Sequence, residues 1–296
     1  MECLFKLKIL LTGITSRTGN AFENYIDKYY PNTVIMNKVS LRDEQYMDED
    51  WSGYDAVIHM AGVSQSKRNL SSDDEEKYCL AINRDLTEKV AKKAKLDGVK
   101  RFIYLSTMMV YGESAPIGEA FTIYRDTVPR PVSAYGKSKL AGECVLKLAD
   151  ERFQVVVVRE SVVYGEHFNG EFCKLLRFSR YCPIFPRINS TKSYIYEGNL
   201  CELLRLLALC GETGIICPQN RERITTSELY LTMRHLQGHG CFLVGRMQGI
   251  LKLLSHFTRY VNATFNDMKY AEELSLIPGF DYQVFSLEES ILRCLN

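Results

Sequence analysis

The sequence lacks an excess of charge of either sign, and this absence excludes the partners that a strong net charge attracts. Its 296 residues include 37 lysines and arginines against 36 aspartates and glutamates, a formal net charge of +1 at pH 7. A chain so close to neutral has no global field that draws it to nucleic acid or to a membrane surface. We therefore expect neither as a partner.

Long apolar runs and metal-binding patterns are also missing. No apolar run approaches the roughly 20 residues of a membrane-spanning helix, and the residues after Met1 do not have the layout of a signal peptide. The ten cysteines form no Cys-x-x-Cys pair, and the five histidines show no metal-ligand spacing. These absences predict a reduced, cytoplasmic protein without a bound metal.

The sequence does contain short apolar runs that alternate with helical stretches, a pattern typical of an α/β protein with a parallel sheet. The runs that predict buried strands lie at 6–12, 33–41, 55–62, 101–106 and 153–159, the third of them running into a turn of small residues. After about residue 165 the strands and helices no longer alternate regularly. The chain is interrupted by Pro183 and Pro186, and short strands and helices follow. We therefore place a domain boundary near residue 165.

A tyrosine and a lysine four residues apart are the first candidates for chemistry. Tyr135 and Lys139 belong to a stretch that begins at Ser133 and has the pattern of a helix to about residue 150. At this spacing both side chains lie on one helix face. An ammonium group near a phenol favours the phenolate and makes a better proton acceptor at neutral pH. Unrelated surface residues show the same spacing, so the pair needs support from the rest of the chain.

A glycine-containing turn follows the first apolar run, with the spacing Gly13-x-x-Ser16-x-x-Gly19. A strand, a glycine turn and a helix in this order place helical N–H groups beneath a diphosphate. Serine stands at the middle position, where a glycine is expected. Any strand-to-helix turn uses glycine for its geometry, so this motif alone is weak evidence.

The end of the second apolar run bears on the choice of dinucleotide. An acid at this point selects NAD, whereas cations or hydroxyls accept the ribose phosphate of NADP. The sequence has Lys38, Ser40 and Arg42 there, with Arg17 in the nearby turn. This favours NADP slightly. An ordinary basic loop remains an alternative, and Asp43 remains a candidate partner for the ribose of NAD.

Two further strand ends carry small or hydroxyl side chains. The third run ends at Ala61 and Gly62, where the chain can approach a ligand closely. The fourth ends at Ser106 and Thr107, at the carboxyl edge where α/β sheets bind ligands. His59, within the third run, is interpreted as an interior group with hydrogen-bond partners rather than as a base.

Taken together, these motifs resemble the extended short-chain dehydrogenase/reductase family, in its NAD-dependent epimerase/dehydratase branch acting on nucleotide sugars. The resemblance covers nearly the whole chain. It rests on Thr12-Gly13-x-x-Ser16-x-x-Gly19, Asp55-Ala-Val-Ile-His-Met-Ala-Gly62, Asn83-Arg-Asp-Leu-Thr87, Tyr104-Leu-Ser-Thr-Met-Met-Val-Tyr-Gly112, Tyr135-x-x-x-Lys139 and Arg159-x-x-x-Val-Tyr-Gly165. It implies a Rossmann-type doubly wound parallel sheet over 1–165. A smaller, mostly helical substrate lobe would follow over 166–296, separate from the first domain or interleaved with it.

The resemblance also implies roles for single residues. Thr107 would hydrogen-bond the reacting sugar oxygen, Tyr135 would act as general acid/base, and Lys139 would bind the nicotinamide ribose and lower the tyrosine pKa. Cofactor contacts are implied for Gly13, Ser16, Arg17, Thr18, Gly19, Ser40, Arg42, Ala61, Gly62 and Ser106, in addition to Tyr135 and Lys139. Substrate contacts are implied for Met108, Tyr164 and Lys192.

Three departures from the family pattern stand out. Ser16 replaces a glycine, Glu160 follows Arg159 where proline is usual, and Lys192 replaces an arginine that grips the substrate diphosphate with two hydrogen bonds. Glu160 puts a carboxylate near the nicotinamide end. The asparagine of the third motif, Asn83, is interpreted as structural.

The function implied by the resemblance is an NAD(P)-dependent nucleotide-sugar epimerase similar to the UDP-sugar 4-epimerases. An NADP-dependent reductase of a keto-sugar nucleotide is the alternative, and no motif separates the two. Dehydration is disfavoured because Met108 and Met109 follow Thr107, where dehydratases carry an Asp-Glu pair. A non-catalytic NAD(P)-sensing regulator is disfavoured because Tyr135 and Lys139 are both intact.

A homodimer is also implied, formed through the helices near 74–97 and 133–150. These helices contain apolar residues that suit either a twofold interface or packing on the sheet: Val90, Ala94, Val145, Leu148 and Ala149.

Overall fold

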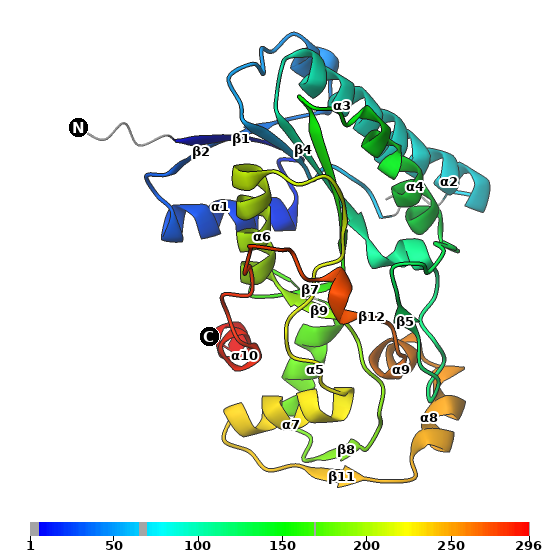
Figure 1. The fold of residues 1–296 in the computed structure, drawn as a ribbon. Coiled ribbons are helices and arrows are strands. Elements are labelled where there is room, and N and C mark those ends of the chain that lie inside the picture. The colour runs from blue at the N-terminus through cyan, green and yellow to red at the C-terminus, as the bar shows by residue number, and fades with distance from the viewer. Residues whose placement is uncertain (1–5, 65–69, 169, 296) are drawn as a thin grey trace. The chain divides into compact units, whose positions relative to one another are not determined.

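A six-stranded parallel sheet is the largest sheet in the described residues of a computed structural model, which are 6–64, 70–168 and 170–295 (Figure 1). The strand order is β2–β1–β3–β4–β6–β10, and each strand is parallel to its neighbours. The strands are β1 Leu7–Thr12, β2 Val34–Val39, β3 Ala56–His59, β4 Arg101–Thr107, β6 Gln154–Glu160 and β10 Gly214–Ile216. The predicted Rossmann-type sheet is confirmed.

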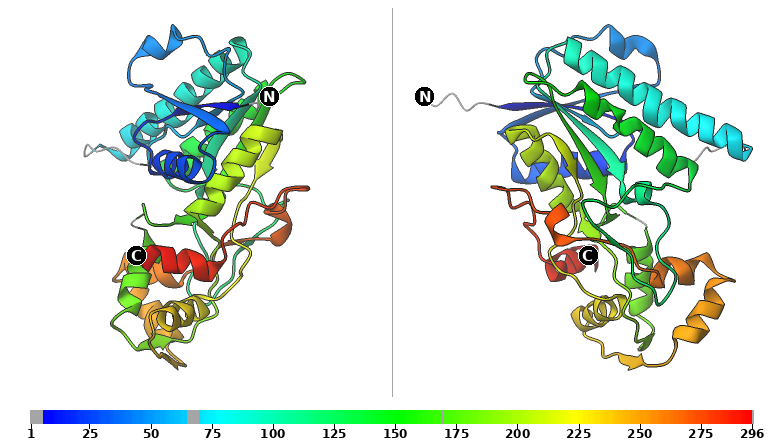
Figure 2. Two further views of the ribbon diagram at one scale, coloured as in Figure 1. Left: turned by 90° about the vertical axis from the view of Figure 1, so that its left-hand side faces the viewer. Right: turned by 45° about the vertical axis from the view of Figure 1, so that its right-hand side comes forward.

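Helices connect these strands and cover both faces of the sheet (Figure 2). One face carries α1 Arg17–Tyr29 and α6 Glu197–Cys210, and the other carries α2 Ser72–Leu80, α3 Thr87–Leu96 and α4 Ala134–Gly142. A π-helical turn, η2 Ala81–Leu86, joins α2 to α3, and α4 continues as the 3-10 helix η4 Glu143–Leu148. The two long helices predicted near 74–97 and 133–150 are therefore present, each with a change of helix type.

The apolar side chains of α3 and η4 pack on the sheet. Val90, Ala94 and Val145 are buried in one cluster with strand residues such as Phe102 and Val155. Leu148 and Ala149 pack against the same cluster and are partly buried. Burying each large apolar side chain stabilises the fold by about 1.5–3 kcal/mol. Val90, Ala94 and Val145 are therefore used in packing on the sheet.

The chain divides into two compact, interleaved units. The first unit comprises Met1–Gly112, Val128–Glu160 and Leu200–Cys217; the second comprises Glu113–Thr127, Ser161–Asn199 and Pro218–Asn296. The chain passes from the first unit to the second after Gly112 and again after Glu160, and its last return supplies β10. The return is a consequence of strand pairing, because β10 completes the edge of the sheet beside β6.

The second unit combines short helices with three pairs of very short parallel strands. Its described helices are α5 Glu171–Ser179, α7 Thr226–Leu236, α8 Gln248–Ser255, α9 Arg259–Phe265 and α10 Leu287–Leu295. The strand pairs are β5 Thr122–Ile123 with β12 Lys269–Tyr270, β7 Val162–Tyr164 with β9 Tyr194–Tyr196, and β8 Ile184–Pro186 with β11 Phe242–Val244. Residues 256–258 separate α8 from α9.

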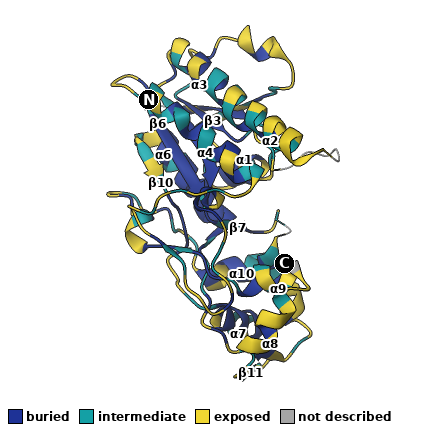
Figure 3. Ribbon diagram, turned by 90° about the vertical axis from the view of Figure 1, so that its right-hand side faces the viewer, coloured by how far each residue is buried: buried dark blue, intermediate teal, exposed yellow. Residues whose placement is uncertain are grey.

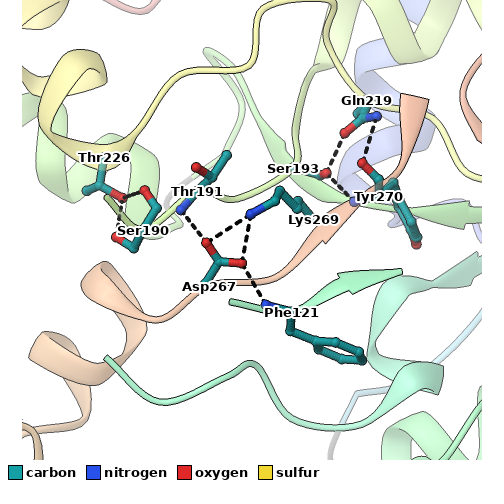
Figure 4. A network of polar contacts seen from close by, with 9 residues as sticks. All are labelled: Phe121, Ser190, Thr191, Ser193, Gln219, Thr226, Asp267, Lys269 and Tyr270. Carbon is teal, nitrogen blue, oxygen red and sulfur yellow. Dashed lines mark hydrogen bonds and ion pairs between the residues drawn. The ribbon is translucent and has the colours of Figure 1, made fainter. Parts of the chain in front are cut away.

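Stacked aromatic rings and one buried carboxylate hold the second unit together. Tyr164 stacks on Phe172 with 3.7 Å between ring centroids. Asp267 is buried and accepts hydrogen bonds from the backbone N–H of Phe121 at 2.9 Å and of Thr191 at 2.7 Å (Figure 4). A single side chain thus ties together three segments that are far apart in the sequence.

None of the helices in the described part of the chain has the length and apolar character needed to span a lipid bilayer. The nine cysteines of the described residues are thiols. Cys3 lies outside the described residues.

Candidate functional site

Helix α4 presents Tyr135 and Lys139 next to the end of strand β4. The helix begins as predicted, because the Ser133 hydroxyl accepts a hydrogen bond from Gly136 N at 3.0 Å and caps the first turn. Lys139 is buried, and its Nζ donates a hydrogen bond to the carbonyl oxygen of Leu105 at 2.8 Å. The ammonium group is therefore fixed to the strand that carries Ser106 and Thr107.

Thr107 is the last residue of β4 and lies within reach of the tyrosine. Its Oγ1 accepts a hydrogen bond from Met109 N at 3.3 Å, which caps the 3-10 helix η3 Met108–Tyr111. A hydrogen bond between Thr107 and the Tyr135 phenol acts to lower the phenol pKa. The structure thus brings Thr107 and Tyr135 together, with Lys139 one turn further along α4.

Glu160 joins this group from the neighbouring strand. It is the last residue of β6 and the register partner of Thr107 in the β4–β6 ladder. Its Oε1 is buried and has no hydrogen-bond partner among the described residues. Burial raises the pKa of its carboxyl group from 4.5 to about 7, while the nearby Lys139 acts to lower that pKa. Buried carboxylate oxygens are seldom left without a partner, so Glu160 is a candidate for a functional role.

The pKa values of the pair differ from the expectation that Lys139 lowers the tyrosine pKa. Burial raises the pKa of Tyr135, and the Glu160 charge raises it further. Burial also lowers the pKa of Lys139 from 10.5 to about 8, against the opposing effect of Glu160 and Glu143. In this state the cost of a buried phenolate outweighs any help from the lysine.

A buried ion pair lies beside strand β4 and contacts one of its last residues. Arg159 grips Glu143 with two hydrogen bonds, Nε to Oε1 at 2.9 Å and Nη2 to Oε2 at 2.6 Å. Ser106 donates its hydroxyl to Glu143 Oε1 at 2.7 Å. Ser106, predicted as a cofactor contact, is thus engaged in the interior. Sequence reasoning missed Glu143, although it lies one helical turn after Lys139 on the same face.

The glycine turn after β1 has the geometry expected for close packing of two backbones. Gly13 has a φ of +84°, and a Cβ atom there would lie 2.7 Å from Ala61 N. Ser16 caps α1 by accepting a hydrogen bond from Gly19 N at 3.2 Å. The remaining first-turn N–H groups, including those of Arg17 and Thr18, have no intrahelical acceptor and suit a diphosphate.

Asn83 clamps the Ala61–Gly62 turn against α4. Its Oδ1 accepts from Val63 N at 2.9 Å, and its Nδ2 donates to Val63 O at 2.8 Å and to Ser138 Oγ at 2.9 Å. A Cβ atom at Gly62 would lie 3.0 Å from Lys139 Nζ. The turn therefore lies against the lysine, and the structural role of Asn83 is confirmed.

Of the residues predicted to meet the adenosine ribose, one is already engaged. Lys38 forms an ion pair with Glu23 at 2.5 Å, on helix α1. Arg17 and Arg42 are exposed and have no carboxylate partner among the described residues, and the Ser40 hydroxyl accepts from Arg42 N at 3.4 Å. The two arginines are the cations that remain for a ribose phosphate.

The residues predicted to contact substrate are engaged within the protein. Met108 is buried in the first unit. In the second unit, Tyr164 is fully buried, and its phenol oxygen lies 2.6 Å from Ser290 Oγ and 2.8 Å from Asn220 Nδ2. Lys192 Nζ donates to Glu171 Oε2 at 3.2 Å and to the carbonyl oxygen of Ala263, and burial lowers its pKa. A substrate contact by Tyr164 or Lys192 requires that these partners be exchanged.

His59 is an interior group, as predicted. Its ring nitrogens lie 2.8 Å from Thr12 Oγ1 and 3.0 Å from Thr87 Oγ1. Burial lowers its pKa to about 3, and the Lys139 charge lowers it too. His59 is therefore neutral at physiological pH and acts as a hydrogen-bonded link between β1, β3 and α3.

Glu166, His167 and Glu197 are a group within the described chain whose side chains are of metal-ligating type. Their ligand atoms lie within 4.8 Å of one another. Glu197 Oε1 already accepts a hydrogen bond from Glu166 N at 2.7 Å, and His167 Nδ1 lies 3.1 Å from the same oxygen. These contacts fix the turn before α5, so we assign the group a structural role.

Comparison with known proteins identifies a family and its members that this chain resembles. A family model described as "NAD dependent epimerase/dehydratase family" matches residues 1–178. A UDP-glucose 4-epimerase of Vibrio cholerae is 32% identical over 155 residues, which are 50% of this chain and 46% of that protein. The chain thus matches about half the length of this relative.

Two solved structures share the fold over nearly the whole chain. A dTDP-4-dehydrorhamnose reductase from Bacillus anthracis in complex with NADP has a TM-score of 0.67 and 19% identity, covering 98% of this chain and 99% of its own. A UDP-glucuronic acid 4-epimerase from Bacillus cereus in complex with NAD has a TM-score of 0.64 and 16% identity, covering 97% and 96%. At such identities the likeness shows the fold alone.

Proposed function

Because the chain belongs to the NAD-dependent epimerase/dehydratase family, we propose that it is an NAD(P)-dependent nucleotide-sugar 4-epimerase. One observation carries the proposal. Thr107 and Tyr135 are linked by their side chains at the carboxyl end of β4, and Lys139 is fixed to the same strand. A general acid/base and a second hydroxyl side by side are the groups needed to move a proton on and off a sugar oxygen.

The residues of the first unit fit a dinucleotide. The turn at Gly13 and the start of α1 offer backbone N–H groups to a diphosphate, and the absence of a side chain at Gly62 lets the backbone lie directly against Lys139. The unpartnered Oε1 of Glu160 accepts from a donor such as a carboxamide N–H. Lys139 retains N–H groups for a ribose, since one of them is bound to Leu105 O.

Tyr135 and Thr107 carry the proton chemistry in this proposal. A bound nicotinamide would supply the hydride acceptor and donor, and its oxidised ring would add positive charge. Thr107 orients the C4 hydroxyl, and Tyr135 accepts the proton of that hydroxyl. Tyr135 then returns the proton to the same oxygen to complete the epimerisation. Positive charge near Tyr135 lowers its pKa and offsets the effect of burial and Glu160.

A keto-sugar nucleotide reductase is the second candidate, because Arg17 and Arg42 are free for the ribose phosphate of NADP. The same Thr107 and Tyr135 would then give a proton to the sugar oxygen in one direction only. An epimerase regenerates its cofactor in each turnover, whereas a reductase consumes reduced cofactor. The two functions therefore differ in whether reduced cofactor must be supplied for turnover.

Mass spectrometry of the purified protein, followed by assays with UDP- and dTDP-sugars, tests the proposal. A retained dinucleotide, NAD or NADP, and conversion of a sugar to its C4 epimer without added cofactor are the expected results. Net loss of NADPH with a keto-sugar nucleotide favours the reductase. A protein that binds cofactor yet turns over neither class of substrate contradicts both.

A further inference from the structure

Helix α8 carries apolar side chains that the rest of the chain does not cover. Ile250, Leu253 and Leu254 of α8 and Phe257 just beyond it follow the i, i+3, i+4, i+7 spacing of one helical face. Their exposed fractions are 55%, 63%, 42% and 78%. Leu251 is buried and packs α8 onto the core of the second unit. The helix thus has two apolar faces, of which one is used inside the chain.

The β8–β11 ribbon beside α8 is apolar on its surface as well. Ile184 and Phe242 are register partners, so their side chains lie on the same face of the ribbon, and 53% and 74% of them are exposed. Val244 is also exposed, and a short turn connects it to α8. Figure 3 shows α8 mainly in the colour of exposed residues, near β11 at one end of the second unit. We call the exposed apolar residues of α8, Phe257 and this ribbon the α8–β11 surface.

The sequence stretch that contains α8 and β11 carries charge of one sign. Between Glu228 and Asp267 the sequence contains neither aspartate nor glutamate, but it contains four cationic residues: Arg234, Arg246, Lys252 and Arg259. The balance of the whole chain, 37 basic against 36 acidic residues, conceals this local excess. The expectation of no membrane partner rested on that overall balance.

Four cations are positioned to act with the apolar residues. Arg246 and Lys252 are exposed on or next to α8, and Arg180 and Arg187 are exposed on either side of β8. The structure gives none of these four an ion-pair partner within its described residues. Apolar side chains surrounded by unpaired cations match the interfacial region of a bilayer, where acyl chains lie beneath anionic headgroups.

We propose that the α8–β11 surface docks the protein on an anionic lipid bilayer. Leu253, Phe242 and Phe257 enter the boundary between headgroups and acyl chains, and the cations pair with lipid phosphates. This binding lies in the plane of the membrane surface and needs no spanning helix. It is independent of the proposed enzymatic function.

A second copy of the chain is a poorer occupant of the α8–β11 surface. A twofold interface brings the same patch of both subunits together. The cations of one copy would then face those of the other, with no acidic residue between 229 and 266 to separate them. An anionic bilayer supplies the negative charge that residues 229–266 lack.

Flotation with lipid vesicles tests the proposal without substrate or cofactor. The full chain is mixed with vesicles of phosphatidylcholine alone or of equal parts phosphatidylcholine and phosphatidylglycerol. We expect binding to the anionic vesicles that weakens as salt is added. Leu253→Ser with Phe257→Ser should lower the partition coefficient by at least about tenfold. Each of Lys252→Glu and Arg187→Glu should lower it by about fivefold or more.

The matched control is Leu96→Ser, which removes an apolar side chain that is 86% exposed on α3 of the first unit. All of these side chains are exposed, so the variants should unfold at the same temperature as the wild type. Absence of binding to anionic vesicles overturns the proposal, as does equal binding to both vesicle types. An equal loss in Leu96→Ser overturns it as well. A dimer in ultracentrifugation that Phe257→Ser converts to monomer would assign the surface to a second copy instead.

Discussion

At the scale of single residues, the proposed chemistry depends on the phenol oxygen of Tyr135. Tyr135→Phe removes that oxygen and leaves the α4 backbone unchanged. We expect turnover with UDP- or dTDP-sugars to fall about 10²–10⁴-fold, the usual contribution of general acid/base catalysis. Cofactor affinity, measured by titration, should change little, because the backbone turns at Gly13 and Gly62 are untouched.

Thr107→Ser is the matched control that keeps a hydroxyl beside Tyr135, whereas Thr107→Val removes it. Unchanged turnover in Tyr135→Phe would mean that the proton travels by another group.

Glu160 gives the protein a distinct dependence of stability on pH. Its pKa is raised from 4.5 to about 7 in the folded state. Between these values the unfolded chain releases a proton that the folded chain retains, so stability falls as pH rises from about 4.5 to 7. Lys139, with its pKa lowered to about 8, acts in the opposite sense, and stability rises again from about 8 to 10.5.

Glu160→Gln should abolish the fall in stability between about pH 4.5 and 7. At pH 7.5 we expect the variant to be more stable than the wild type by about 1–3 kcal/mol, because a buried charge is lost. Urea unfolding at several pH values measures the effect. In activity assays the pH at which turnover rises should move downward, since Glu160 raises the Tyr135 pKa. A variant with the wild-type pH profiles would show that Glu160 does not titrate in this range.

At the scale of elements, the π-helical turn η2 holds the Ala61–Gly62 turn in place through Asn83. Asn83→Ala deletes two hydrogen bonds to the backbone of Val63 and one to Ser138. We expect a loss of about 1–3 kcal/mol in the free energy of unfolding, because buried backbone groups are left without partners. Cofactor affinity should weaken too, since Gly62 lies beside Lys139.

Asn83→Asp is the graded control for this clamp. An aspartate keeps the oxygen that accepts from Val63 N and loses the two donated bonds, so its effects should lie between those of asparagine and alanine. Stability comes from urea unfolding and affinity from cofactor titration. If the alanine variant bound cofactor as tightly as the wild type, η2 would serve the fold without shaping the site.

The elements also show how far the sequence could predict this structure. Local patterns were sufficient for five strands of the sheet and for the shared helix face of Tyr135 and Lys139, because apolar runs and i,i+4 spacing determine them. The position of Thr107 beside this pair was implied by the family resemblance and not by a local pattern. Partner choices across long separations were out of reach, such as Tyr164 with Ser290. Strands of two residues such as β5 and β12 have too few positions for a period-2 pattern to appear.

Contacts within the folded chain occupy two of the side chains that were candidates for cofactor binding. Lys38 had the right position for a ribose phosphate, but Glu23 on α1 neutralises it. Ser106 had the right position for a cofactor, but Glu143 takes its hydroxyl. In both cases a neighbouring charge, which strand and helix patterns do not specify, decided where the side chain binds.

At the scale of the whole molecule, binding of a dinucleotide should raise the unfolding temperature of the protein. A ligand that binds only the folded state at 100 times its Kd adds about 2.7 kcal/mol to stability. For a chain of this size, each kcal/mol shifts the midpoint by roughly 2–4 °C, so the expected shift is about 5–10 °C.

Comparison of NAD and NADP in thermal denaturation, each titrated to saturation, also gives the cofactor preference. The exposed Arg17 and Arg42 favour NADP, so Arg42→Ala should reduce the shift with NADP and leave the shift with NAD unchanged. The matched control is Lys38→Ala, because the Lys38 side chain is already bound to Glu23 and should not discriminate between the cofactors. A larger shift with NAD than with NADP in the wild type would reverse the assignment of the ribose-binding residues.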